Sequence, residues 1–103
     1  MSSDTPSKAP APAARAIRHD EAARRFEWTE DGHPCVLDYV LDGAVVSFTH
    51  TGVPAAVGGR GIAADLARFG LDTARARGWR VRPLCSYVAA FVRRHPEYQD
   101  LMD

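Results

Sequence analysis

The sequence lacks most of the features that mark nucleic-acid-binding, disulfide-bonded, metal-binding and membrane-spanning proteins. Its 13 basic and 13 acidic residues balance, so net charge does not indicate nucleic acid as a partner. The two cysteines make no disulfide framework and stand in no metal-binding spacing. No stretch approaches the roughly 20 apolar residues of a membrane span, and no apolar run near the start resembles a signal peptide. We therefore expect a reduced, soluble, cytoplasmic protein with no metal site and no membrane or nucleic-acid partner.

Lysine is almost absent as well, because Lys8 is the only one and every other basic residue is an arginine. The composition is otherwise that of a globular protein, and 103 residues suffice for one domain. Residues 1–14 are rich in Pro, Ala and Ser and lack large apolar side chains after Met1, which predicts a disordered tail. Residues 15–103 are expected to form a single domain.

Four segments of that domain have the pattern of strands, at 17–19, 24–29, 35–41 and 44–51. Turn signals at 30–32 and at Asp42-Gly43 predict that consecutive strands pair antiparallel. From Gly61 the apolar residues recur at helical spacing, and Gly78 is typical of a helix stop after Arg77. The region thus predicts a four-stranded meander followed by a long helix.

A short, buried fifth strand is expected at 79–83, and a second helix from Ser86 or Tyr87 to Arg94. Pro96 blocks the extension of that helix, and one last turn is expected at 97–102. The long helix allows the fifth strand to lie parallel to the fourth. The predicted fold is therefore α/β, with a mixed sheet and two main helices. The large side chains assigned to its core are Phe26, Trp28, Phe48, Leu66, Phe69 and Trp79.

The turn Gly58-Gly59-Arg60-Gly61 leads straight into the long helix and predicts a phosphate-binding site. A helix start exposes about four unpaired N–H groups and the positive end of the helix dipole. No Ser, Thr, Asp or Asn stands at 57–60 to cap these groups, and the glycines let a ligand approach the backbone closely. A loop whose glycines serve only the chain geometry is the alternative.

Residues 59–64 also match the G-x-G-x-x-A fingerprint of dinucleotide-binding folds. Three observations count against that fold. The preceding strand ends well before Gly58, no acidic residue follows the next strand at 82–84, and an antiparallel meander is not a doubly wound sheet. The absence of a following Gly-Lys-Ser/Thr excludes a P-loop.

Further motifs flank the turn in a definite order. They are His50-Thr51-x-Val53-Pro54, Gly59-Arg60-Gly61-Ile62-Ala63, Pro83-Leu84-Cys85-x-Tyr87-Val88-Ala89-Ala90 and Arg93-Arg94-His95-Pro96-Glu97-Tyr98. Over residues 26–102 the combination resembles the small GCN5-related N-acetyltransferase-like family, the compact single-domain branch of the GNAT superfamily. The resemblance implies a compact GNAT-like fold, acetyl-CoA or coenzyme A as the ligand, and acetyl transfer to a small amine or a protein lysine.

The resemblance also implies where the cofactor lies. Its pyrophosphate would rest on the backbone N–H groups of residues 57–63. Its pantetheine arm would pair with residues 50–53, like an added strand, in a cleft that ends at 83–85. The cofactor-binding residues implied are Thr51, Gly52, Val53, Val57, Gly58, Gly59, Arg60, Gly61, Ile62, Ala63, Cys85 and Tyr87. Arg93 and Arg94 either meet the nucleotide end of the cofactor or form a solvated face.

Two glycines depart from the family pattern. The superfamily turn usually begins with Arg or Gln, so Gly58 removes a side-chain contact with the cofactor. Family members tend to have an acidic residue where Gly52 stands, so an acid that could help to deprotonate an amine is absent. Three functions stay open: an N-acetyltransferase, a non-catalytic CoA-binding module, and an interaction domain that keeps the fold without the ligand.

The catalytic candidates are His50, Cys85 and Tyr98. Histidine is the usual general base near neutral pH, but the alternation of His50 with Phe48 would also point it into the core. Cys85 would line the pocket, carry an acetyl group covalently, or serve as a small buried residue. Tyr98, like Tyr87, would protonate the leaving thiolate or serve packing.

Overall fold

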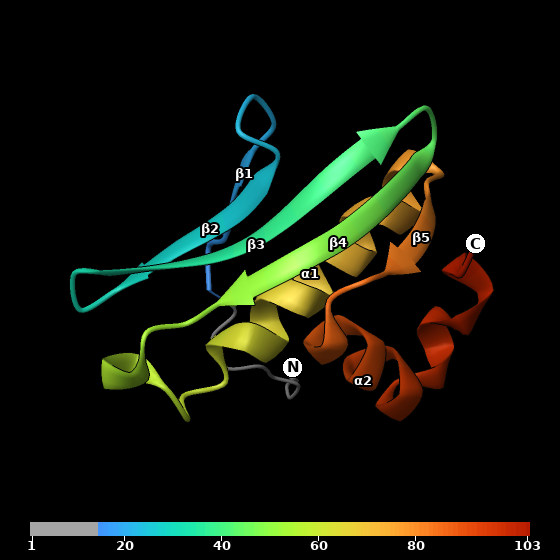
Figure 1. Cartoon of the computed structure of the whole chain (residues 1–103). Coiled ribbons are helices and arrows are strands. Elements are labelled where there is room, and N and C mark those ends of the chain that lie inside the picture. Colours follow the sequence, from blue (N-terminus) through green and yellow to red (C-terminus); the bar gives the residue numbers. More distant parts are fainter. Residues whose placement is uncertain (1–14) are drawn as a thin grey trace, which may run out of the picture.

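The computed structural model describes residues 15–103, so the predicted tail at 1–14 lies outside the described residues. One layer is a five-stranded sheet in the order β1-β2-β3-β4-β5, and the helices cover one of its faces (Figure 1). The elements are β1 (Arg18–Asp20), β2 (Arg25–Glu30), β3 (His33–Asp42), β4 (Val45–Gly52), η3 (Ala55–Val57), α1 (Ile62–Arg77), β5 (Arg80–Pro83), α2 (Ser86–Arg94) and η4 (Pro96–Leu101). No helix in this part of the chain is long and apolar enough to cross a membrane.

The strand pairing is the one that the sequence predicts. Strands β1 to β4 form an antiparallel meander, and β5 lies parallel to β4. Asp31 and Gly32, both with positive φ, make the tight turn between β2 and β3. Gly78 ends α1, where its N–H donates to the carbonyls of Ala74 and Arg75. The mixed α/β fold with two main helices is therefore confirmed, and the predicted strand ends differ from the observed ones by one or two residues.

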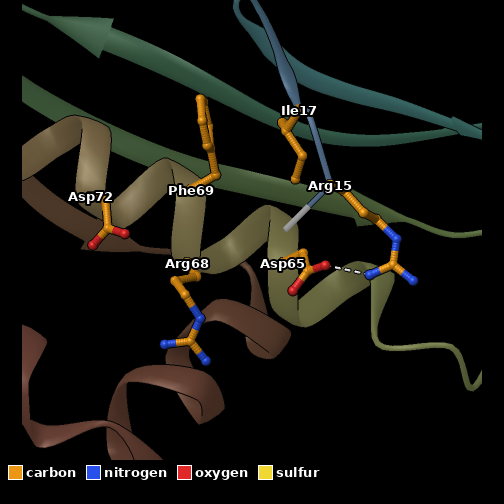
Figure 2. Close-up of a pocket in the computed structure, with 6 residues that line it drawn as sticks. All are labelled: Arg15, Ile17, Asp65, Arg68, Phe69 and Asp72. Atoms are coloured by element: carbon orange, nitrogen blue, oxygen red, sulfur yellow. Dashed lines mark hydrogen bonds and ion pairs between the residues drawn. The ribbon is translucent and has the colours of Figure 1, made fainter. Parts of the chain in front are cut away.

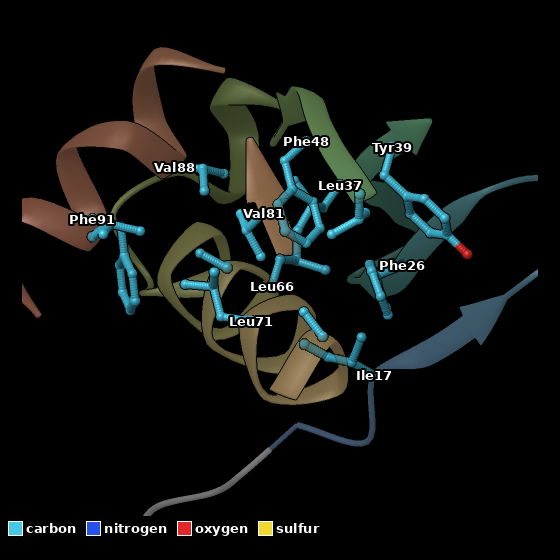
Figure 3. Close-up of a cluster of buried hydrophobic side chains, with 14 of the residues drawn as sticks. Ile17, Phe26, Leu37, Tyr39, Phe48, Leu66, Leu71, Val81, Val88 and Phe91 are labelled. Atoms are coloured by element: carbon cyan, nitrogen blue, oxygen red, sulfur yellow. The ribbon is translucent and has the colours of Figure 1, made fainter. Parts of the chain in front are cut away.

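The core lies between the sheet and the two helices (Figure 3). The sheet contributes Leu37, Phe48 and Val81 to it, and all three are fully buried. Of the aromatic residues assigned to the core, Phe69 was predicted wrongly, because it is 36% exposed. The face of α1 that meets the sheet runs along Leu66, Ala67, Gly70, Leu71 and Ala74, which places Phe69 at its border. The fifth strand is also less buried than expected, since its side chains alternate and only Val81 is buried.

At Gly70 the backbone of α1 lies close against side chains of the sheet. A Cβ atom at this position would lie 2.9 Å from Leu37 Cδ2 and 3.1 Å from Phe48 Cε1. Both neighbours are fully buried, so neither can move without disturbing other core residues. The missing side chain therefore sets the distance between the helix layer and the sheet.

We expect Gly70→Ala to lower the free energy of unfolding by about 1–3 kcal/mol, because overpacking outweighs the gain of about 1 kcal/mol in helix propensity. Urea denaturation measures the change. Ala76→Gly, at an exposed position of the same helix, is the control for propensity and should cost about 1 kcal/mol. If Gly70→Ala instead stabilised the protein, the close contact with the sheet would not exist.

Candidate functional site

The site is built where β4 and β5 part. Their pairing runs from Val45↔Arg80 to Phe48↔Pro83, and the last bond joins the Cys85 N–H to the Phe48 carbonyl over 2.8 Å. Proline lacks an N–H, so Pro83 itself donates no bond to β4, and the Cys85 N–H makes the final one. Beyond that point β3 is the one strand beside β4 among the described residues (Figure 1). Positions 50–52 of β4 pair with β3 on one side and with no described strand on the other.

A β-bulge at Thr49 decides where His50 points. The register shifts from Tyr39↔Phe48 to Asp38↔His50, so Thr49 has no partner of its own. His50 consequently lies on the exposed face of the sheet, and the expectation that alternation with Phe48 would turn it into the core was wrong. A Cβ at Gly52 would lie 3.1 Å from His50 Nε2, which shows that the imidazole sits over that glycine.

Thr51 and Cys85 face each other across the gap between the strands. The Thr51 hydroxyl lies 3.3 Å from the Cys85 thiol, and Cys85 immediately precedes α2. Burial by itself would raise the pKa of the Cys85 thiol. Hydrogen bonds from the Thr51 hydroxyl and from the backbone at Val88, Tyr87 and Thr51 outweigh burial and lower this pKa. The arrangement therefore makes the thiol at the start of α2 more acidic than an ordinary cysteine.

The structure does not bring His50 to this thiol. Successive residues of a strand point to opposite faces, so Thr51 and Cys85 lie on the helix side while His50 lies on the exposed side. A Cys–His pair of the kind used in many nucleophilic enzymes is therefore not formed here. The low thiol pKa has another cause, the hydrogen bonds at the helix start.

The glycine turn presents a row of unpaired backbone donors. Gly59 and Gly61 have φ of +77° and +81°, a conformation that favours glycine, and no side chain caps α1. Within residues 15–103, the N–H groups of 59–64 have no backbone partner, and the first helical bond runs from the Asp65 N–H to the Gly61 carbonyl. The turn thus has the donors that an anion would need.

Two of the predicted donors are already used inside the protein. The Val57 N–H donates to the Pro54 carbonyl over 3.0 Å, and the Gly58 N–H donates to the Ala55 carbonyl over 3.1 Å. Both bonds belong to the 3-10 turn η3, which the sequence did not predict. The expectation that these two N–H groups bind phosphate is therefore corrected, and the available row begins at Gly59.

A network of charged side chains braces the turn from the β2–β3 hairpin. Arg60 Nη1 lies 3.1 Å from Glu30 Oε2 and 2.7 Å from Asp31 Oδ2. Arg15, which was not predicted to have a role, bonds the Asp65 carboxylate and donates to the Arg60 carbonyl over 2.8 Å. Hydrogen bonds from Trp28 and then from Arg60 hold the pKa of Glu30 below its ordinary value. Arg60 would therefore have to exchange partners in order to meet a phosphate.

Tyr98 is not placed at the gap. Its hydroxyl donates to Asp72 Oδ1 of α1 over 2.7 Å, and its ring is almost fully buried. Burial, followed by the bond to the Asp72 carboxylate, raises the pKa of Tyr98 to about 12. Tyr87 stands in the first turn of α2, next to Cys85 and Ser86, and is partly buried. Of the two tyrosines, Tyr87 is therefore the one near the gap.

A separate hollow of about 180 Å³ follows α1 (Figure 2). Its lining residues are Arg15, Ile17, Asp65, Arg68, Phe69 and Asp72. None of them comes from β4 or β5, so this hollow is not the gap between those strands.

We expect Cys85 to react with iodoacetamide at lower pH than an ordinary thiol, because its thiolate is stabilised. Thr51→Val removes one stabilising hydroxyl at nearly constant volume, so the midpoint of the pH–rate profile should move upward and alkylation at neutral pH should slow. Mass spectrometry after timed quenching gives the rates. Cys35 is buried and burial raises the pKa of its thiol, so it should stay unlabelled in the folded protein. An unchanged midpoint in Thr51→Val would contradict the assignment.

Comparisons with known proteins agree with this architecture. A sequence profile described as GCN5-related N-acetyl-transferase matches residues 25–101. Protein NATD1 from Bos taurus is 36% identical over 83 residues, which cover 78% of this chain and 74% of that protein. Protein NATD1 from Mus musculus is 34% identical over the same length. The solved structure of a GCN5-like protein from Staphylococcus aureus superposes with a TM-score of 0.68, at 22% identity, over 88% of this chain and 90% of that one.

The profile match extends over most of the chain, including the whole of β4, the glycine turn and the segment from β5 to η4. The curated relatives cover more than two thirds of the chain at more than 30% identity. The solved structure supports the fold independently. The chain therefore belongs to the GCN5-related N-acetyltransferase family.

Proposed function

We propose that this protein binds acetyl-CoA at the C-terminal end of β4 and transfers its acetyl group to an amine. One observation carries the proposal: two sets of unpaired backbone groups occur at the same end of the sheet. The free edge of β4 at 50–52 and the N–H row at 59–64 are separated in sequence only by the loop that contains η3. A ligand with amide groups and a pyrophosphate, such as coenzyme A, matches both sets.

Each part of that ligand has a counterpart in the chain. The N–H groups from Gly59 onward would hold the pyrophosphate, with the dipole of the 16-residue helix α1 behind them. The unpaired edge of β4 would bond the pantetheine amides as a neighbouring strand does. Thr51, Cys85 and Tyr87 would line the end of the arm, where the strands are closest.

Bound acetyl-CoA would supply a thioester, and the reaction would form a C–N bond, break the C–S bond and release CoA as a thiolate, which would take up a proton from solvent to become the thiol. An N–H of the unpaired β4 edge would donate to the thioester oxygen as negative charge develops there. His50 would accept the proton that the amine loses, from the exposed face of the sheet, which an amine in solution can reach. The acceptor class that the fold suits is a small amine or a protein lysine.

A second function, CoA binding without turnover, is favoured by two observations. Gly52 offers no acidic side chain beside His50, and the Tyr98 hydroxyl is held by Asp72 and not directed at the gap. A domain of this kind would keep the turn and the β4 edge but would release no CoA thiol in the presence of amines. Binding and turnover therefore have to be measured separately.

A negative charge placed on the glycine turn tests whether the turn binds the phosphates of CoA. Coenzyme A at about 100 times its dissociation constant should stabilise the wild-type fold by ~2.7 kcal/mol. Gly59→Asp should remove this stabilisation by repelling the phosphates. Gly59→Asn is the matched control, because Asn and Asp have the same size and both tolerate a positive φ. Equal CoA-induced thermal shifts in wild type and Gly59→Asp would remove the turn from the site.

The same measurement can be made on a substitution at Gly58 that should strengthen CoA binding. Its φ of −66° suits any residue, and a Cβ there would meet only the Ala55 carbonyl oxygen at 3.4 Å and Cα at 4.0 Å. Gly58→Arg should therefore fold normally and add one charged donor beside the pyrophosphate, tightening CoA binding by about 5–10-fold. Weaker binding in a normally folded Gly58→Arg would place the pyrophosphate elsewhere.

Turnover is tested by the release of CoA thiol from acetyl-CoA with a panel of small amines and a lysine-containing peptide. Cys85→Ala should keep measurable activity, because a residue that only lines the pocket supplies no bond to the acetyl group. His50→Gln should lower the rate by about 10²–10⁴-fold with little change in CoA affinity. Complete loss in Cys85→Ala with intact binding would instead indicate an acetyl-cysteine intermediate. No thiol release with any amine would favour the binding module.

A further inference from the structure

The arginines of this chain fall into two groups. Most of those in the described residues are held by carboxylates, as Arg60, Arg75 and Arg77 are. Within residues 15–103, however, five arginines make no ion pair within 4.0 Å. Arg80 bonds backbone carbonyls and Arg24 lies between β1 and β2, so the three on helices are Arg68, Arg93 and Arg94. Arg68 lies in the second turn of α1 and the other two lie in the last turn of α2.

Two of these unpaired arginines border the space between α1 and α2. Arg68 Cζ lies 5.3 Å from the centre of the Phe91 ring, and Figure 2 shows this side chain directed away from Ile17 and Phe69. The Phe91 ring lies 6.4 Å from the Tyr87 ring. Tyr87, Phe91 and Arg94 are spaced by four and three residues, so they share one face of α2. We call Arg68, Tyr87 and Arg94 the interhelical basic group.

The nearby carboxylates of α1 do not neutralise this group. Asp65 and Asp72 stand one helical turn before and one after Arg68, on the same side of the helix (Figure 2). Asp65 is bonded by Arg15, and Asp72 accepts the Tyr98 hydroxyl. Neither makes an ion pair with Arg68. Burial raises the pKa of Tyr87, and the positive charges of Arg94 and Arg68 both act against that rise, so both guanidinium groups lie in the neighbourhood of this ring. Guanidinium groups without carboxylate partners suit a multiply charged anion.

The position of the group relates it to the glycine turn. Arg68 is six residues beyond Ile62, or about 9 Å along the helix axis at 1.5 Å per residue. Tyr87 is in the first turn of α2, which begins where β4 and β5 part. A ligand whose phosphates lie on the turn therefore has Arg68 about 9 Å further along α1.

We propose that Arg68 and Arg94 bind the 3′-phosphate on the ribose of coenzyme A. This inference rests on the proposed function and specifies which group of the cofactor the chain recognises by its charge. The pyrophosphate would be held by backbone donors, and the 3′-phosphate by side chains. The protein would thereby distinguish coenzyme A from ligands that carry pantetheine but no 3′-phosphate.

The test compares coenzyme A with dephospho-CoA, which lacks only the 3′-phosphate. Isothermal titration calorimetry of the full chain should give an affinity for coenzyme A about tenfold higher, equivalent to about 1.4 kcal/mol at 25 °C. Added salt should reduce this ratio, because exposed guanidinium–phosphate contacts are screened. Equal affinity for the two ligands in the wild type would overturn the inference while leaving the proposed function intact.

The double variant Arg68→Gln/Arg94→Gln assigns the preference to these residues. It should bind the two ligands equally, with an affinity for dephospho-CoA within about twofold of wild type. That second value controls for folding, since Arg68 also packs on Phe91. Arg24→Gln is the matched control, because Arg24 makes no ion pair among the described residues and lies between β1 and β2.

The outcomes separate the two proposals. If the double variant kept the full preference for coenzyme A while Arg24→Gln lost it, the 3′-phosphate would bind elsewhere. Loss of dephospho-CoA binding in a double variant that melts like the wild type would also contradict the inference, because these arginines would then act on another part of the ligand. If neither ligand bound the wild type, the proposed function itself would fail, and this inference with it.

Discussion

The separation of β4 from β5 is the constraint on which the rest of the site depends. The bond from the Cys85 N–H to the Phe48 carbonyl is the last link between the two strands. Pro83 donates no bond to β4, and Cys85 already leads into α2. This separation leaves the β4 edge unpaired. It also brings the Thr51 hydroxyl to the Cys85 thiol and places the start of α2 beside the gap. An α/β packing without this separation would have the same core but no open backbone edge.

An anion bound at the glycine turn, as proposed, would lie close to several carboxylates. Glu30, Asp31 and Asp65 all lie near it, and Arg60 is paired with two of them. Arg60 and Asp31 are both well exposed, and exposed ion pairs contribute only about 0–1 kcal/mol. An exchange of Arg60 from a carboxylate to a phosphate would therefore cost little. The backbone donors need no such exchange, so they would carry most of the binding.

The sequence predicted the parts of the fold that follow from local chemistry. Alternation located the strands, and the stop at Gly78 followed from its need for a positive φ. Three features of the site did not follow, because each depends on a non-local event. The bulge at Thr49 reversed the face of His50, and the 3-10 turn consumed the Val57 donor. The contact between Thr51 and Cys85 joins residues 34 apart, so no local pattern could predict it.

His50 and Gly52 have to be understood together. The imidazole occupies the space that a side chain at residue 52 would fill, since a Cβ there would lie 3.1 Å from Nε2. A side chain at this position would therefore require the imidazole to shift by a few tenths of an ångström. The glycine thus leaves no carboxylate beside His50, and the ring lies close to the backbone at the end of β4. Under the proposed function, an imidazole on the exposed face beside the unpaired β4 edge would act as a base without an acidic neighbour at 52. The absence of the acid is consequently compatible with turnover, provided that the proton passes through His50.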